Sequence, residues 1–196
     1  MSPVTRDRNT LLIAAGVVVM LGVLAVWTAS SFAAMRVSPT GDSLHYLKGH
    51  LMRVFVGLVV GIIAWRMRAS MLQFLAVPAY FAALALLALT VVASGSALAP
   101  EINGSTRWLH LGPVRLLPSE LMRYGYVLLS AFMASRSWWD ARKLWHFGLM
   151  ALAAVIPMVL ILSQPDFSGS AYLGAVMMVM LLLAGARFKH LVLLGG

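Results

Sequence analysis

The residues best suited to chemistry lie in one stretch, from Asn103 to Arg123, with the sequence NGSTRWLHLGPVRLLPSELMR. Two glycines, two prolines, one glutamate and three arginines fall within these 21 positions, although the surrounding chain is apolar. The first half is typical of an ordered loop, and the second half carries Glu120 and Arg123 into the next apolar run. Ionisable groups inside a membrane helix are costly and usually face a polar cavity or a partner. The stretch therefore predicts the polar site of an integral membrane protein.

Arg107 and Trp108, in the middle of this stretch, have two interpretations. Tryptophan is enriched at the membrane–water interface, where a neighbouring arginine can extend its charged head into water. The guanidinium fork of Arg107 is also well matched to a phosphate group. The sequence leaves interfacial anchoring and anion binding open as alternatives.

Glu120 and Arg123 are three residues apart on an expected helix, so they share a face and can form an ion pair. A structural pair is one interpretation, and their position inside a membrane helix favours a functional one. Arg123 could also neutralise a phosphate. If Glu120 pairs with Arg123, Glu120→Ala should destabilise the protein more than Asp166→Ala, since removing one partner of a buried pair costs about 3–5 kcal/mol.

A second polar segment, Gln164 to Gly169, separates the last two apolar runs. An aspartate at such a boundary is often the N-cap of the following helix, and we favour that role for Asp166. No metal site is expected, because the histidines lack the spacing of metal ligands, and the sequence identifies no cofactor. Motifs for ATP binding or for the standard hydrolases are also absent.

The composition indicates a membrane protein. Of 196 residues, 61% are hydrophobic and 11% are charged, with a mean hydropathy of +0.89, whereas soluble domains carry roughly 25% charged residues. The absence of cysteine excludes disulfides and a thiol nucleophile. A net charge of +9 would suggest nucleic-acid binding in a soluble protein. Here the basic residues flank apolar runs, so membrane topology explains them and no nucleic acid is expected as a partner.

Six apolar runs predict an all-α membrane domain of six spanning helices, with no second domain within residues 1–196. The expected helices are residues 11–34, 51–65, 71–93, 118–134, 146–163 and 170–186. The first run is longer than the 7–15 apolar residues of a signal peptide, so cleavage is not expected. Nine basic residues fall on the side of the two ends and four on the other side. Because basic loops stay in the cytoplasm, both ends are predicted there, and the two polar segments face outward.

Several motifs, taken together and in order, resemble the SEDS family (shape, elongation, division and sporulation; the FtsW, RodA and SpoVE proteins). The main signature is Asn103-Gly104-x-x-Arg107-Trp108-x-x-Leu111-Gly112-Pro113, followed by Pro118-Ser119-Glu120-Leu121. Three further stretches are similar to family motifs: Thr28-Ala29-Ser30, His45-Tyr46-Leu47-Lys48, and Gln164-Pro165-Asp166-Phe167 with the later Ala184-Gly185-Ala186-Arg187-Phe188-Lys189-His190-Leu191. The resemblance is greatest to the division (FtsW-type) branch.

The resemblance implies a peptidoglycan glycosyltransferase of the bacterial inner membrane. Such proteins polymerise lipid II, a disaccharide-pentapeptide on a polyprenyl pyrophosphate. They work with a class B penicillin-binding protein, a transpeptidase, and with other membrane proteins of the divisome or elongasome. The expected substrate-binding residues are Arg107, Trp108, Ser119, Glu120, Arg123, Gln164 and Asp166.

This chain departs from the family pattern at three points. The family usually has lysine where this chain has Arg123, and Ser168 is an additional residue before Gly169. The family has about ten membrane helices, and its expected catalytic aspartate lies in an outer loop beyond the end of this sequence. The sequence therefore does not place the catalytic base, and resembles a truncated polymerase, one piece of a split gene or a short paralogue. A lipid II flippase or transporter, and a non-catalytic membrane scaffold for cell-wall enzymes, are the alternative functions.

Overall fold

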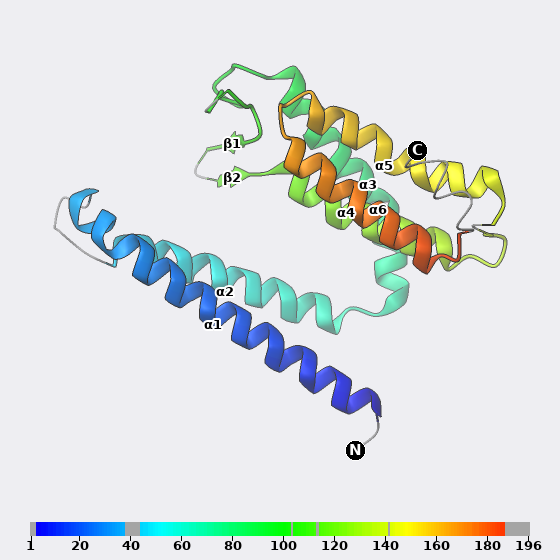
Figure 1. Ribbon diagram of the computed structural model, residues 1–196, viewed down its shortest axis with the longest axis horizontal. Helices are drawn as coiled ribbons and strands as arrows, with labels where there is room; N and C mark the ends of the chain where they lie inside the picture. The colour runs from blue at the N-terminus through cyan, green and yellow to red at the C-terminus, as the bar shows by residue number, and fades with distance from the viewer. Residues whose placement is uncertain (1–2, 38–43, 103, 113, 141, 187–196) are drawn as a thin grey trace. The chain divides into compact units, whose positions relative to one another are not determined.

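The protein is described by a computed structural model that covers residues 3–37, 44–102, 104–112, 114–140 and 142–186. The chain forms two compact units, Met1–Met67 and Arg68–Gly196. The described residues form helices and one short hairpin (Figure 1). Asn103 and Pro113 of the signature, and the family-like stretch from Arg187 to Leu191, lie outside the described residues.

The first unit consists of two long helices that pack against each other, α1 (Pro3–Val37) and α2 (His45–Arg66). The helices contain apolar spans at Asn9–Ser30 and Tyr46–Arg66, and the most apolar window of each span has no buried residue. Leucine, isoleucine and valine side chains therefore remain on the outside of this unit. Exposing so much apolar surface to water is unfavourable, so these helices fit a lipid environment.

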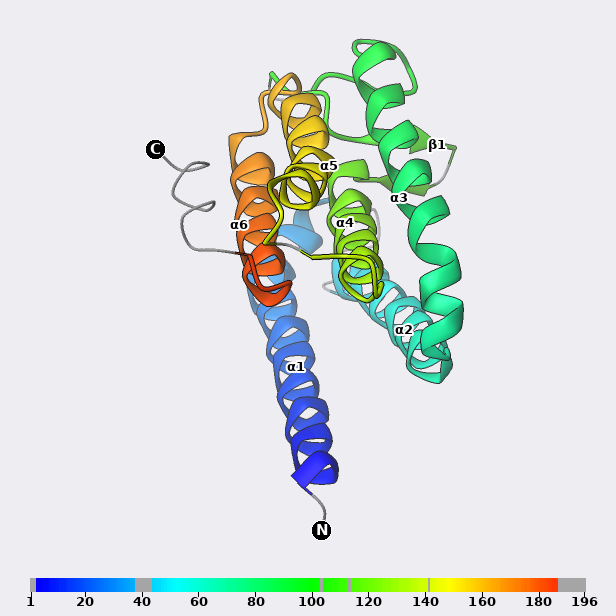
Figure 2. The same cartoon turned by 90° about the vertical axis from the view of Figure 1, so that its right-hand side faces the viewer.

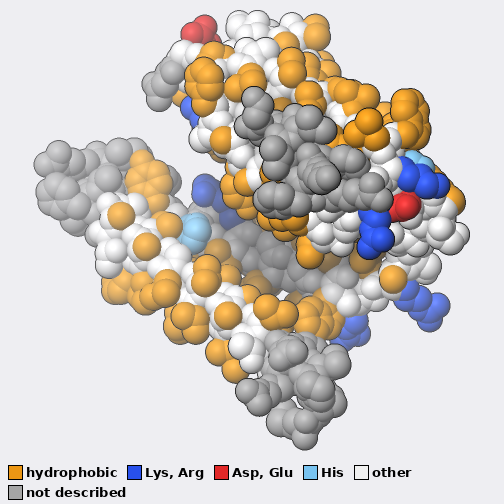
Figure 3. Space-filling model, turned by 45° about the vertical axis from the view of Figure 1, so that its right-hand side comes forward, with side chains coloured by type: hydrophobic (Ala, Val, Ile, Leu, Met, Phe, Trp, Pro, Cys, Tyr) orange, Lys and Arg blue, Asp and Glu red, His pale blue; other side chains and the backbone are white. Residues whose placement is uncertain are grey.

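The second unit packs four helices around a core. They are α3 (Ala69–Val92), α4 (Pro118–Ala134), α5 (Leu144–Leu162) and α6 (Phe167–Leu183). Fully buried side chains from all four helices meet in this core, among them Leu87, Met122, Tyr126, Met150, Ile161, Leu173 and Leu181. The outside of the unit is also apolar, and Figure 3 shows hydrophobic side chains over much of the described surface on the face drawn.

Polar groups within this core are satisfied by the backbone of α5. Pro157 has no N–H to bond the carbonyl of Ala153, four residues earlier in the helix. The hydroxyl of Tyr80 in α3 donates a hydrogen bond to that carbonyl at 2.8 Å. A neighbouring helix therefore satisfies the backbone group that the proline frees, which is how prolines are tolerated within membrane helices.

Gly125 allows α3 and α4 to approach closely, because a Cβ at this position would lie 3.2 Å from the Cα of Tyr80. We expect Gly125→Ala to lower the free energy of unfolding by up to about 2 kcal/mol, since overpacking outweighs the gain in helix propensity. The matched control is Gly148→Ala in α5, where an added Cβ meets nothing within 4 Å. In thermal unfolding of the purified protein in detergent, Gly125→Ala should have a lower melting temperature than both wild type and the control. The opposite order would contradict the close approach.

The segment between α3 and α4, which the sequence predicts to be an ordered loop, contains a small antiparallel hairpin. Its strands are β1 (Leu109–Leu111) and β2 (Val114–Leu116). Gly112 begins the turn with a φ of +62°, a conformation that L side chains rarely adopt. Leu109 is fully buried, and the backbone N–H of His110 donates to the carbonyl of Leu98 at 2.7 Å. The hairpin is therefore fixed to the loop that carries it.

Within the described part of the chain, four helices are long and apolar enough to span a membrane, namely those at Asn9–Ser30, Tyr46–Arg66, Ala69–Val92 and Leu144–Leu162. The remaining two, α4 and α6, have 17 residues each. At ~1.5 Å per residue such a helix is about 26 Å long, slightly less than the apolar core of a bilayer. The expected count of six spans and the cytoplasmic location of both ends remain predictions.

Candidate functional site

The two polar segments that the sequence singles out meet at one end of the second unit. The hydroxyl of Ser105 donates to the backbone carbonyl of Gln164 at 2.6 Å, across 59 positions of sequence. The guanidinium of Arg107 and the carboxylate of Asp166 form an ion pair, with Nη1 and Oδ1 3.6 Å apart. Figure 2 shows the loop between α3 and α4 at the same end of the helices as the turn between α5 and α6. The structure therefore brings Arg107 and Asp166 together.

Asp166 is the N-cap of α6, as the sequence predicts. Its Oδ1 accepts hydrogen bonds from the backbone N–H of Gly169 at 3.0 Å and from the hydroxyl of Ser168 at 2.9 Å. Because the cap begins at Asp166, α6 starts at Phe167, three residues before the expected Ser170. A Cβ at Gly169 would collide with the Asp166 carboxylate. The aspartate is thus a buried anion, 6% exposed at its side chain, whose donors fix its position.

Among the described residues, the contact with Asp166 leaves several N–H donors of Arg107 without a partner. Its side chain is 40% exposed, and a guanidinium carries five N–H donors. The negative charge of Asp166 orients the arginine without using all of these donors. An anionic group arriving from outside can therefore bind the same guanidinium.

Gln164 is held in the interior of the unit. It is 2% exposed, and its Nε2 donates to the backbone carbonyl of Leu87 in α3 at 3.4 Å. The backbone carbonyl oxygen of Gln164 accepts a hydrogen bond from the hydroxyl of Ser105. The residue therefore connects the turn to α3 and to the loop, and its expected contact with substrate remains a prediction.

Glu120 and Arg123 form the ion pair that their spacing predicts, with a separation of 2.6 Å between Nη1 and Oε1. The guanidinium also lies 4.3 Å from the centre of the Tyr172 ring in α6, a cation–π contact. The Nε of Arg123 is buried and has no hydrogen-bond partner among the described residues. Glu120 is 45% exposed at its side chain, so this is a partly exposed pair rather than a buried one.

Among the described residues, the side chains of Ser119 and Trp108 make no hydrogen bond with either pair. Ser119 is 2% exposed, and its hydroxyl is buried without a partner among the described residues. Trp108 is 39% exposed and lines a separate pocket on the hairpin side of the loop. Arg107 and Trp108 are neighbours in sequence, but they make contacts in different places.

The candidate residues thus form two clusters rather than one. The first is the loop cluster, Ser105, Arg107, Gln164 and Asp166, and the second is the helix cluster, Glu120, Arg123 and Tyr172. Sequence reasoning missed Ser105 and Tyr172. Ser105 lies within the signature stretch, where its hydroxyl was a visible signal, but nothing in the sequence distinguishes Tyr172 from other aromatic residues.

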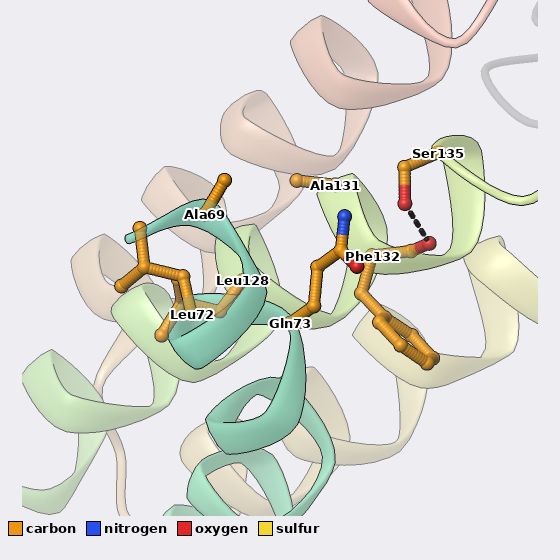
Figure 4. A pocket seen from close by; sticks show the side chains of 7 residues that line it. All are labelled: Ala69, Leu72, Gln73, Leu128, Ala131, Phe132 and Ser135. Carbon is orange, nitrogen blue, oxygen red and sulfur yellow. Dashed lines mark hydrogen bonds between the residues drawn. The ribbon is translucent and has the colours of Figure 1, made fainter. Parts of the chain in front are cut away.

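A cavity at the opposite end of α3 and α4 contains no charged group. Figure 4 shows its lining, in which Gln73 projects from α3 and the Ser135 hydroxyl donates to the carbonyl of Phe132. Its volume is about 180 Å³, and its other lining residues are alanine and leucine. Without a charge or a nucleophile it is less suited to chemistry than the loop and helix clusters. Among the described residues, no group of three or more histidine, aspartate or glutamate side chains could hold a metal ion.

Comparisons with known proteins identify relatives along nearly the whole chain. A probable peptidoglycan glycosyltransferase FtsW of Nitrosococcus halophilus is 35% identical over 182 residues, which cover 90% of this chain and 45% of that protein. A second protein of the same description, from Aromatoleum aromaticum, is 32% identical. The matched residues cover 96% of this chain and 46% of that protein. The chain therefore spans about half the length of the curated relatives it matches.

Solved structures agree with the sequence comparison. The rod shape determining protein RodA of Thermus thermophilus has a TM-score of 0.64 at 26% identity, over 88% of this chain and 55% of RodA. A chain from a structure describing polymerisation and crosslinking by a peptidoglycan synthase complex has a TM-score of 0.65 at 26% identity, over 88% of this chain and 49% of its own.

The family model described as Cell cycle protein, FtsW/RodA/SpoVE, matches residues 8–196. That match covers almost the entire chain and contains all the candidate residues described above. Together with the four apolar helices of the described residues, it identifies a multi-pass membrane protein. The chain belongs to the FtsW/RodA/SpoVE family of cell cycle proteins.

Proposed function

We propose that this chain is the substrate-handling part of a peptidoglycan glycosyltransferase that polymerises lipid II at the outer face of the bacterial inner membrane. The observation that carries the proposal is the convergence of Arg107 on Asp166, from two segments 59 residues apart. The names of the relatives support the same activity. Six membrane spans with both ends in the cytoplasm would place the loop cluster on the outer side, where the substrate is used.

The substrate is an amphiphile with a pyrophosphate between its sugar and its lipid. Among the described residues, both Arg107 and Arg123 have N–H groups without a partner. Guanidinium groups bind phosphate oxygens through paired hydrogen bonds. In the proposed reaction a sugar hydroxyl attacks the anomeric carbon of a second sugar, the bond to the polyprenyl pyrophosphate breaks, and a carboxylate base takes the hydroxyl proton. No described residue is assigned as that base.

The expected protein partner is a class B penicillin-binding protein, which crosslinks the glycan by transpeptidation. The similarity to a chain of a peptidoglycan synthase complex supports such an assembly. Other membrane proteins of the divisome or elongasome would join the same complex.

The test reconstitutes the protein, together with a class B penicillin-binding protein, in liposomes loaded with lipid II. Glycan product and lipid II translocation are measured in the same preparation. Glycan formation supports the proposal. Translocation without glycan would favour a flippase, and the absence of both would favour a scaffold.

Arg123 allows a more specific prediction within this function. Arg123→Lys keeps the charge opposite Glu120, removes the stacking on Tyr172 and eliminates the unpaired Nε–H. Loss of the cation–π contact costs about 0.5–1 kcal/mol, and removal of an unpaired buried donor offsets it by a similar or larger amount. We therefore expect an unchanged melting temperature but a roughly three- to tenfold weaker affinity for polyprenyl pyrophosphate, because lysine lacks the fork. A loss of stability with unchanged affinity would contradict this role.

A further inference from the structure

The hairpin between α3 and α4 carries a pocket that lies outside the loop and helix clusters. Ile102, Trp108, His110 and Arg115 line it, and its volume is about 230 Å³. His110 and Arg115 are directly opposite each other in the register of β1 and β2, so their side chains are on the same face of the hairpin. Trp108 lies two residues before His110, which in extended chain also places it on that face.

The pocket offers hydrogen-bond donors without supplying an acidic partner. The Nε2 of His110 is buried and has no hydrogen-bond partner among the described residues. Arg115 is exposed on the hairpin, and none of the four lining residues is acidic. A buried polar atom without a partner costs free energy unless a ligand or ordered water satisfies it. The arrangement therefore suits a ligand that brings its own anionic acceptor.

Trp108 adds a flat apolar surface to this pair. Its side chain remains 39% exposed, so the indole is available to a ligand. The volume is below the roughly 300 Å³ of a pocket for a complete small molecule, so it fits one unit of a longer ligand. The hairpin belongs to the loop rather than to the lipid-facing sides of the helices, which favours a water-soluble ligand over a phospholipid head group.

We propose that this pocket binds an acidic saccharide. The sugar ring packs on the indole of Trp108, and a carboxylate of the ligand accepts hydrogen bonds from the guanidinium of Arg115 and from Nε2–H of His110. The site is separate from the Arg107–Asp166 pair. In lipid II the carboxylates belong to the peptide attached to the sugar, and the assignment to this disaccharide-peptide, rather than to another acidic sugar, rests on the proposed function.

The test uses the full-length protein in nanodiscs of zwitterionic lipid and a lipid-free disaccharide-pentapeptide of peptidoglycan. Calorimetry compares this acidic probe with the same compound after amidation of its carboxylates. We expect the acidic form to bind about tenfold more tightly to wild type, as for a charge-assisted hydrogen bond. Arg115→Gln and His110→Phe should each remove most of that preference, because neither keeps the donor in question, and Trp108→Ala should weaken binding of both forms. Arg136→Gln, which removes a cation from the other end of α4, should leave the preference unchanged.

Equal binding of the acidic and amidated probes by wild type would overturn the proposal, as would an unchanged preference in folded Arg115→Gln. Displacement of the probe by nanodiscs containing anionic lipid would also overturn it, in favour of a head-group site. The polymerisation assay separates this inference from the proposed function. If glycan forms but the acidic and amidated probes bind equally, only the pocket proposal is refuted. If the acidic probe binds more tightly but no glycan forms, only the polymerase assignment is refuted.

Discussion

Asp166→Ala is expected to lower the free energy of unfolding by roughly 2–4 kcal/mol, the largest loss among the candidate site residues. The helix cap contributes about 1 kcal/mol, and buried donors left without an acceptor cost about 1–3 kcal/mol more. The carboxylate is 6% exposed and accepts from both Gly169 and Ser168, so water replaces it poorly. Chemical or thermal unfolding of the full-length protein in detergent measures the loss.

Asp166→Asn is the matched control for this prediction. An asparagine oxygen can accept the same two hydrogen bonds, but it carries no charge for Arg107. We expect this variant to retain most of the stability and to lose activity with Arg107 displaced. Equal destabilisation by alanine and asparagine would contradict the capping role.

The structure changes the expected order of stability losses for Glu120→Ala and Asp166→Ala. A buried Glu120–Arg123 pair would make Glu120→Ala the more harmful substitution, but the Glu120 side chain is 45% exposed. Ion pairs with one exposed partner contribute about 0–1 kcal/mol. Asp166→Ala should therefore destabilise the protein more than Glu120→Ala, and the reverse order would contradict the contribution of burial.

Local rules predicted much of this structure. The (i, i+3) spacing gave the ion pair between Glu120 and Arg123, Pro118 begins α4, and the position of Asp166 before an apolar run indicated a cap. These features depend on residues a few positions apart. Local helix geometry determines these features, so the sequence alone was enough to predict them.

Contacts between distant segments were harder to predict. The hydrogen bond from Ser105 to Gln164, the burial of the Gln164 amide against α3 and the stacking of Arg123 on Tyr172 depend on how the helices pack. The hairpin was expected only as loop, because its strands have three residues each and lack an extended alternating pattern. Family motifs indicated which residues matter, but they did not indicate that these residues form two clusters.

Arg107→Gln is expected to reduce glycan polymerisation about 10- to 100-fold, the largest effect on activity. The size corresponds to the loss of one charge-assisted hydrogen bond to a phosphate, about 1.5–3 kcal/mol. Stability should change by no more than about 1 kcal/mol, because Arg107 is 40% exposed and lies 3.6 Å from Asp166. Polymerisation of lipid II and the melting temperature, measured on the same preparation, separate the two effects.

Arg136→Gln provides the charge-matched control for this measurement. Its guanidinium stacks on Phe132 at the far end of α4, away from both clusters, so glycan output should stay within about twofold of wild type, as for a surface substitution. Wild-type output from Arg107→Gln would contradict a role in substrate handling.

The double variant of Arg107 and Asp166 then distinguishes two ways in which the pair could act. If Arg107 acts only in the position that Asp166 gives it, Asp166→Asn already removes most of the activity, and adding Arg107→Gln costs little more. If Arg107 binds phosphate without help from the carboxylate, the two losses in log rate add, as for independent sites. Because the two side chains are in contact at 3.6 Å and the aspartate is fixed by its cap, we expect the first result. Additive losses would mean that Asp166 contributes to activity independently of Arg107, and that Arg107 binds substrate without help from the carboxylate.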